Sequence, residues 1–217
     1  MAYTPIERNR INPVVQSISR FIMRLLGWGV VGGECPVNKA VISAAPHRSN
    51  WDLFYTLLSA ASSNVPMWFM MKHNLFFWPL TIAWYYLGGV PINRGASNSV
   101  VSQMVKALNR NERMYLVITP EGTRKEVEYW TSGFYYIARE ANVPIWPWYI
   151  NYETKRTGSG PLIYPTDNIE EDFKRIRAFF EENNIAMPSC RPRPRKNKGN
   201  ANEENNETAD KQTHSAD

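Results

Sequence analysis

The sequence predicts an α/β fold in which a mostly parallel sheet is flanked by helices on both faces. Between residues 40 and 183, short apolar or β-branched runs alternate with amphipathic helical patterns, and this alternation is typical of parallel sheets that are covered on both sides. The chain has 217 residues, of which 43% are apolar and 13% aromatic. That is enough for one sizeable core and too little for a second large domain. We therefore expect one folded domain.

The expected elements follow in order along the chain. Strands are expected at residues 40–44, 67–71, 90–92, 114–119 and 143–150, and helices from about residue 51, around 77–87, and at 97–109, 131–141 and 168–183. The helix at 97–109 illustrates the reasoning, because its Val, Met and Leu side chains fall on one stripe at helical spacing. Ligands of such sheets bind at the carboxyl ends of the strands, so we expect a site in the segments that follow them.

Two uncharged runs, residues 53–71 and 74–92, approach the length of a membrane span. Each is interrupted, the first by SSNVP and the second by Pro79 and a Gly88-Gly89 pair, which do not fit one continuous helix. The second run is rich in Trp and Tyr, which favour boundaries between apolar and wet regions. We interpret it as an apolar surface or a lipid-lined channel rather than as a span.

The N-terminal segment at residues 12–29 has the pattern of an amphipathic helix. At about 100° per residue its large apolar side chains fall within an arc of roughly 140°, opposite Gln16, Ser17, Arg20 and Arg24. The two arginines interrupt the apolar core that a secretory signal would need. Two interpretations stay open: a first helix packed on the domain, or a helix in the lipid interface with its arginines near anionic headgroups.

The composition divides the chain into three parts. Residues 1–33 are predicted to form the amphipathic, membrane-interacting segment, 34–188 the main domain and 189–217 a disordered tail. The tail has no aromatic and no aliphatic β-branched residue, so it cannot bury enough apolar surface to offset its ordering entropy. It contributes +1 of the net charge of +5. The remaining basic charge suits an anionic partner such as phosphate, a membrane surface or nucleic acid, without distinguishing among them.

The stretch APHRSNWDLF, residues 45–54, combines a histidine and an aspartate at the start of an expected helix. His47 follows a strand, and Asp52 falls in the first helical turn, where its carboxylate can reach one imidazole nitrogen. A carboxylate on Nδ1–H fixes the tautomer and stabilises an imidazolium, leaving Nε2 to take a proton from a substrate hydroxyl. By itself the pattern is weak evidence for a general base with its orienter, because a loop histidine beside an acidic residue is the commoner case.

Three further segments place polar or basic side chains at the ends of expected strands. In TPEGTRK a reversal at the glycine can aim N–H groups, a hydroxyl and a guanidinium at one anion. The other two, MMK and GGVPINRG, each end a strand near a cation. Each segment also has an ordinary interpretation, as a tight turn or as a solvated cation. The candidate residues are Lys72, Arg94, Glu121, Gly122, Thr123 and Arg124.

Five segments together resemble the motifs of the glycerolipid acyltransferase family, whose type member is bacterial 1-acylglycerol-3-phosphate acyltransferase. In chain order they are PHRSNWD, MMKHNLFFWPL, GGVPINRG, TPEGTRK and VPIWPWYI, from residue 46 to 150. Any one of these motifs is weak evidence, whereas four in register are specific. The resemblance implies that residues 34–188 form an acyltransferase domain of the glycerolphosphate acyltransferase-like fold.

The resemblance also implies a reaction. His47 would be the general base of an HxxxxD motif that activates the acceptor hydroxyl, with Asp52 as its orienter, and the hydroxyl would attack an acyl thioester directly, without an acyl-enzyme. The acceptor, with its phosphate on the cations, would be held by Arg94, Glu121, Gly122, Thr123 and Arg124, together with Lys72. The donor would be acyl-CoA or acyl-carrier protein, and the acceptor a lysophospholipid, foremost 1-acyl-sn-glycerol 3-phosphate. No metal or other cofactor is implied, and we expect a membrane-associated enzyme of phospholipid synthesis on the cytoplasmic face.

Departures from the family pattern leave the acceptor open. Pro46 stands where asparagine is common, Asn93 where an acidic residue is common, and Trp146 and Trp148 where smaller aliphatic residues are usual. One alternative is therefore an acyltransferase for a different lysolipid or an amino-acid-derived lipid. Another is a catalytically inactive, peripheral lipid-binding protein.

Other chemistries fit the sequence less well. A serine hydrolase would need G-x-S-x-G, which GSG at residues 158–160 does not provide. Zinc lacks ligands, because besides His47 the chain has only His73 and His214, and Cys35 and Cys190 have no metal-site spacing. Nucleic acid is not expected as a partner, since Arg-Pro tails are usually solvated. Two isolated cysteines mildly favour a reducing compartment.

Overall fold

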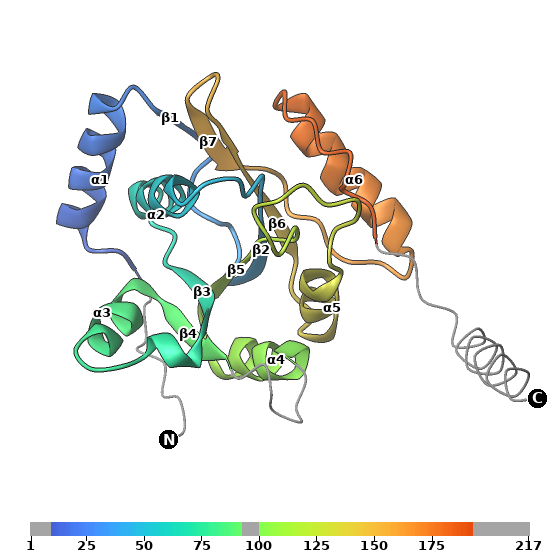
Figure 1. Ribbon diagram of the computed structural model, residues 1–217, viewed down its shortest axis with the longest axis horizontal. Coiled ribbons are helices and arrows are strands. Elements are labelled where there is room, and N and C mark those ends of the chain that lie inside the picture. Colours follow the sequence, from blue (N-terminus) through green and yellow to red (C-terminus); the bar gives the residue numbers. More distant parts are fainter. Residues whose placement is uncertain (1–9, 93–99, 193–217) are drawn as a thin grey trace, which may run out of the picture.

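Strands and helices alternate along the chain in the computed structural model, which describes residues 10–92 and 100–192 (Figure 1). The strands are β1 Gly29–Val31, β2 Lys39–Ala45, β3 Met67–Lys72, β4 Gly89–Ile92, β5 Met114–Ile118, β6 Ile145–Asn151 and β7 Arg156–Ser159. The helices are α1 Pro13–Leu25, α2 Trp51–Ser62, α3 Leu80–Leu87, α4 Val100–Arg110, α5 Gly133–Glu140 and α6 Ile169–Glu182, with the short 3₁₀ helix η1 His73–Leu75.

The strands form one sheet in the order β1-β7-β6-β2-β5-β3-β4. The strands from β6 to β4 run parallel, β7 pairs antiparallel with β6, and β1 pairs parallel with β7. The predicted α/β fold with a mostly parallel sheet is therefore confirmed, and the expected strands correspond to β2 through β6. The carboxyl ends of β6, β2, β5, β3 and β4 lie at one edge of the sheet, so the segments that follow them can meet there.

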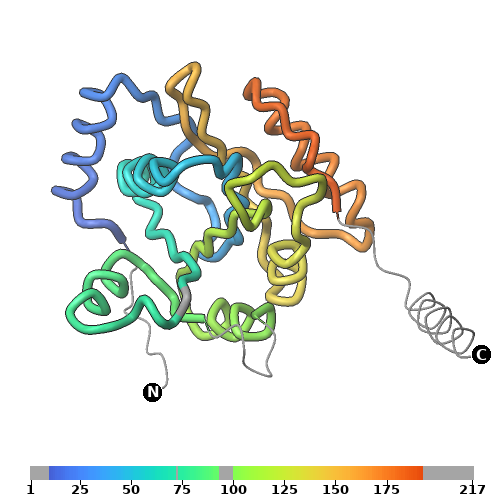
Figure 2. The backbone as a smooth tube through the Cα atoms, in the orientation of Figure 1, coloured from blue at the N-terminus to red at the C-terminus, as the bar shows by residue number. Residues whose placement is uncertain are grey.

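Helices cover both faces of the sheet, and each face has its own apolar core. In Figures 1 and 2, α1 and α2 lie to the left of the central strands, and α5 and α6 to the right. The face under α4, α5 and α6 buries Phe134, Phe173 and Phe180. The opposite face, under α2, buries the two tryptophans of β6, Trp146 and Trp148. Two covered faces explain why the strands are apolar along most of their length.

The sequence does not predict the outer strands β1 and β7. Both are short, and β7 reads RTGS, which has no apolar alternation. Their pairing depends on Gly158, because a Cβ added there would lie 2.1 Å from the Val31 carbonyl oxygen. Only a glycine allows the two backbones to approach this closely. The segment predicted as separate, residues 1–33, thus contributes a strand to the sheet.

The amphipathic N-terminal helix predicted from the sequence is α1. The side chain of Asn12 caps it by accepting from the Val14 N–H at 2.8 Å. The helix buries Ser19 and Met23, and Met23 belongs to a small core with Trp28 and residues of α2. Its apolar stripe is exposed at Val14, Val15, Ile18, Phe21 and Leu25, and at Leu26 just after its end. The helix therefore packs on the domain and still presents an apolar face to the outside.

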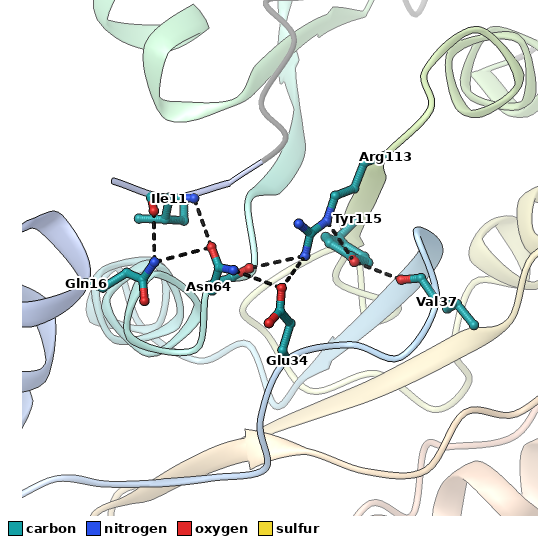
Figure 3. Close-up of polar contacts among 7 residues, drawn as sticks. All are labelled: Ile11, Gln16, Glu34, Val37, Asn64, Arg113 and Tyr115. Atoms are coloured by element: carbon teal, nitrogen blue, oxygen red, sulfur yellow. Dashed lines mark hydrogen bonds and ion pairs between the residues drawn. The ribbon is translucent and has the colours of Figure 1, made fainter. Parts of the chain in front are cut away.

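Asn64, just after α2, holds the segment before α1 to the domain (Figure 3). Its Oδ1 accepts from the Ile11 N–H at 3.0 Å, and its Nδ2 donates to Glu34 at 2.8 Å. Glu34 also accepts from Arg113 at 3.0 Å, and the same guanidinium donates to the Tyr115 hydroxyl at 3.1 Å. These contacts lie at the amino edge of the sheet, away from the strand ends that carry the motifs. They fix where α1 begins.

Neither uncharged run forms a span. Residues 53–71 divide into α2 and β3, and residues 74–92 contain α3 and β4. Within residues 10–92 and 100–192, no helix has both the length and the apolar character needed to cross a bilayer. Phe77, Trp78, Ile82 and Tyr86 are each more than half exposed. Residues 74–92 therefore form an apolar surface, which is one of the two interpretations given for this run; the other was a lipid-lined channel.

The predicted start of the disordered tail, residue 189, lies too early in the chain. Ser189 and Cys190 are buried, and the backbone N–H of Trp130 donates to the carbonyl oxygens of Ser189 and Arg191. Cys190 packs into the core, although the tail as a whole is polar in composition. For that reason composition alone does not predict that these first residues are folded. Residues 193–217 lie outside the described residues.

We expect Gly158→Ala to destabilise the fold by about 1–3 kcal/mol, because the added methyl group overlaps the backbone of β1. Urea unfolding followed by circular dichroism measures the change. Gly133→Ala is the matched control, since nothing lies within 4 Å of a Cβ added at this first residue of α5. Equal stability of Gly158→Ala and the wild type would contradict the pairing of β1 with β7.

Candidate active site

His47 and Asp52 meet at the carboxyl edge of the sheet. His47 lies in the loop after β2, and Asp52 lies in the first turn of α2. His47 Nδ1 is 3.2 Å from Asp52 Oδ2, and the two side chains are 22% and 6% exposed. The spacing read from the sequence thus produces a buried carboxylate beside a partly exposed imidazole. With Nδ1 engaged by Asp52, Nε2 is the nitrogen that can exchange a proton with a substrate.

The Asp52 carboxylate is held by donors from two distant parts of the chain. Oδ2 accepts from the backbone N–H groups of Arg48 and Ser49, each at 2.7 Å, and Oδ1 accepts from the Tyr152 hydroxyl at 2.6 Å. Burial disfavours the charged form, but the hydrogen bonds from His47, Tyr152 and the two N–H groups outweigh burial and lower the pKa of Asp52. Asp52 is therefore an ionised acceptor at neutral pH and not a second acid.

Glu121 supports the same loop from the segment after β5. The residue is 7% exposed, and its Oε2 accepts from the backbone N–H of His47 at 2.7 Å. Burial raises the pKa of Glu121, and the His47 N–H and the positive charge of Arg48 oppose that rise. The resemblance implies that Glu121 contacts the acceptor, whereas the structure buries this carboxylate against the loop that carries His47. Its observed contact holds the histidine backbone in place.

The rest of TPEGTRK forms an exposed turn beside the dyad. Gly122 has a φ of 67°, in the left-handed region that glycine favours, and its N–H donates to the Thr119 carbonyl oxygen at 3.0 Å. Thr123 and Arg124 follow on the surface. The turn therefore presents a hydroxyl and a guanidinium to a ligand that approaches from solvent.

Of the two remaining candidate cations, only Lys72 lies within the described residues. Lys72 is the last residue of β3 and pairs in the sheet with Ile92, the last residue of β4. Arg94 lies outside the described residues. The structure thus brings together His47, Asp52 and the turn after β5, and it places the backbone of Lys72 at the same edge.

Two cavities lie on opposite sides of α2. A small one of about 60 Å³ at His47 is lined also by Asp52, Thr119 and Trp148. A larger one of about 450 Å³ lies between α1, α2 and α3, and its volume is typical of small-molecule sites, at roughly 300–1,000 Å³. Its apolar lining includes Val15, Phe54, Leu57, Leu58, Ala61 and Leu87. Residues of α2 therefore line both the small cavity at the dyad and the larger apolar cavity.

The candidate site residues that the sequence singled out, from His47 to Arg124, fall within the segment that a known family model matches. The acyltransferase family model matches residues 30–151, more than half of the chain. The chain belongs to this acyltransferase family. The family that the sequence motifs predict is thereby confirmed.

The fold of this acyltransferase is also similar to a solved structure. The crystal structure of the 1-acyl-sn-glycerophosphate (LPA) acyltransferase, PlsC, from Thermotoga maritima matches with a TM-score of 0.56 and 18% identity, over 80% of each chain. At this identity the likeness bears on the fold alone. Among curated proteins, none matches the sequence significantly.

Sequence reasoning misses one residue of the acyltransferase that touches the dyad. Tyr152 lies just after β6, 100 positions from Asp52, and its hydroxyl contacts the Asp52 carboxylate. An aromatic residue after a strand at the ligand-binding edge is the only signal, and many surface tyrosines share it. Within the described residues, no three His, Cys, Asp or Glu side chains lie close enough together to hold a metal ion.

Because the pKa of Glu121 is raised, replacing its carboxylate by an amide should maintain or increase the stability of the protein at high pH while it lowers the activity. Its charge opposes folding at high pH, and that penalty disappears as the pH falls through the folded-state pKa. Glu121→Gln is therefore expected to be at least as stable as the wild type at pH 8, with the difference shrinking toward pH 4. Acyl transfer should fall about tenfold, because a charge-assisted hydrogen bond to the His47 N–H is weakened.

Urea unfolding at both pH values and an acyl-transfer assay test this pair of effects. Glu112→Gln, at an exposed position after α4, is the matched control and should change neither quantity. A Glu121→Gln protein that is less stable than the wild type at pH 8, yet equal to it near pH 4, would contradict the assignment.

Proposed function

We propose that this acyltransferase transfers a fatty acyl group from a thioester, acyl-CoA or acyl-carrier protein, to the free hydroxyl of a lysophospholipid. The preferred acceptor is 1-acyl-sn-glycerol 3-phosphate, which gives phosphatidic acid. The observation that carries the proposal is the contact of His47 Nδ1 with the buried, ionised Asp52 at the mouth of a cavity. In an acyltransferase this arrangement suits activation of a hydroxyl.

The chemistry proceeds by general base catalysis. His47 Nε2 takes the proton of the acceptor hydroxyl while its oxygen attacks the thioester carbonyl carbon. The ionised Asp52 stabilises the imidazolium that forms and keeps Nδ1 protonated. The tetrahedral intermediate collapses with loss of the thiolate, which the imidazolium protonates. The acyl group passes directly to the acceptor, so no side chain becomes acylated.

The acceptor phosphate is assigned to the cations at the same edge of the sheet. Arg124 and Thr123 are exposed next to Glu121 and the dyad, and a guanidinium can bind two phosphate oxygens at once. We assign Lys72 and Arg94 to the same phosphate, as the family resemblance implies. Gly122 lets the turn approach the ligand closely, because it carries no side chain.

The acyl chain is assigned to the cavity between α1, α2 and α3. Its lining is largely apolar and its volume of about 450 Å³ is ample for part of an acyl chain. The cavity adjoins the exposed apolar residues of α1 and α3, so lipid could enter from a membrane without crossing water. We place the enzyme at the cytoplasmic face of the membrane, as the family resemblance implies.

A different acceptor remains the second candidate, and one observation favours it. Trp148 is 1% exposed and lines the cavity at His47, donating from its indole N–H to Thr157 Oγ1 at 3.1 Å. A fixed indole where the family has smaller aliphatic residues narrows the space beside the reacting atoms. Such a site would select another lysolipid or an amino-acid-derived lipid.

His47→Ala should reduce acyl transfer by about 100- to 10,000-fold, the usual contribution of a general base. The assay incubates purified protein with radiolabelled acyl-CoA or acyl-carrier protein and a panel of lysolipids and acylated amino acids. His73→Ala, at the exposed histidine of η1, is the matched control and should retain activity.

Each outcome of this assay is informative. Thioester turnover that persists in His47→Ala contradicts the base assignment. If the wild type consumes no thioester, and the wild type and His47→Ala bind lipid equally well, the protein is an inactive lipid-binding protein and not an enzyme. The preferred lysolipid decides between the two acceptor classes.

Membrane binding through α1 predicts a second effect. Phe21 and Leu25 are 66% and 74% exposed. Replacing either by glutamate should weaken binding to anionic vesicles by about tenfold, because an apolar side chain that the bilayer would bury is lost and a negative charge is added. Vesicle flotation measures the bound fraction. Tyr164→Glu, at a 56% exposed aromatic residue outside this face, is the control. Unchanged binding of both α1 variants would remove the case for this anchor.

A further inference from the structure

Tyr152 joins the dyad to the end of α1. It lies in the turn after β6, directly beyond residues 30–151, the segment that the family model matches. Its hydroxyl donates to Asp52 Oδ1 at 2.6 Å, while His47 Nδ1 and the N–H groups of Arg48 and Ser49 contact Oδ2. The carboxylate is therefore held at both oxygens, by groups from two segments that are 100 residues apart in the sequence.

We propose that Tyr152 is a positioning residue for acyl transfer, which fixes the Asp52 carboxylate so that Oδ2 faces His47 Nδ1. The inference rests on the proposed role of His47 as the base. A carboxylate turns easily about its Cβ–Cγ bond, because that torsion has broad minima. The contacts on Oδ2 resist this rotation from one side of the carboxylate, and the short hydrogen bond on Oδ1 resists it from the other.

Two aromatic rings, those of Trp28 and Tyr55, hold Tyr152 in place. The Trp28 and Tyr55 rings stack at 4.2 Å, and both meet the Tyr152 ring edge to face, at 5.3 and 5.9 Å. Trp28 follows α1, is 6% exposed, and its backbone N–H donates to the Met23 carbonyl oxygen of that helix at 2.8 Å. The position of the phenol therefore depends on α1 and α2, although the residue as a whole is 43% exposed.

Tyr152 remains a donor across the neutral range. Burial, the hydrogen bond to Asp52 and the charge of that carboxylate all raise the pKa of the phenol. Tyr152 therefore does not serve as an acid or base in the reaction. It affects the reaction only indirectly, because it orients the Asp52 carboxylate that contacts His47.

The test is Tyr152→Phe, which removes the hydroxyl and keeps the ring. We expect kcat to fall about tenfold while KM for the lysolipid and the unfolding temperature stay close to those of the wild type. Tyr164→Phe is the matched control, because this exposed tyrosine follows Ile163, which pairs with Ile145 at the other end of β6. The six intervening residues separate that end from Tyr152 by about 20 Å.

A double-mutant cycle distinguishes positioning from a general structural role. In an Asp52→Asn background, Tyr152→Phe should change the residual kcat by less than twofold, because the group through which it acts is already gone. An unchanged kcat for the single variant, or the same tenfold loss in both backgrounds, overturns the proposal. Failure of the proposed function looks different: the wild type would be inactive, or His47→Ala would retain activity.

Discussion

The site depends on the burial of one charge, the Asp52 carboxylate. An ionised carboxylate is costly to bury unless donors replace its water, and here the donors are the loop after β2, the histidine itself and a tyrosine after β6. Meeting that requirement fixes the loop, because the same contacts set the positions of Arg48 and Ser49. The start of α2 adds a favourable dipole for a negative side chain in its first turn. The geometry of the dyad therefore results from satisfying one buried anion.

A second carboxylate, Glu121, differs from the first in its surroundings. It receives one backbone N–H from His47 and has a raised pKa, whereas Asp52 receives several donors and has a lowered one. Both hold the histidine, Asp52 by its ring and Glu121 by its backbone. Strand order makes this possible, since β5, which leads to Glu121, lies directly beside β2, which leads to His47. On the other side of α2, an apolar cavity and the exposed faces of α1 and α3 lie within reach of the same helix.

Much of this arrangement can be predicted from the sequence, because the strands that build the parallel part of the sheet are apolar runs bounded by turn residues. The alternation identifies β2 to β6, and the motif spacing identifies His47 and Asp52. Gly158, which allows β1 to pair with β7, lies in a segment without apolar periodicity. Tyr152 reaches Asp52 only through a sheet that brings positions 100 residues apart together. Glu121 could be named but not placed, since whether a carboxylate faces a ligand or the protein depends on packing. The first residues of the predicted tail are held by Cys190, whose burial the composition conceals.

The central claim is that Asp52 keeps Nδ1 of His47 protonated and leaves Nε2 as the base. The most direct test is the ¹⁵N chemical shifts of the imidazole nitrogens in histidine-labelled protein, at a pH where the ring is neutral. The chain has three histidines, so His47→Gln assigns the signals. We predict protonated Nδ1 and unprotonated Nε2 for His47 in the wild type, and loss of that preference in Asp52→Asn. A wild-type His47 with protonated Nε2, or identical shifts in the two proteins, would contradict the account.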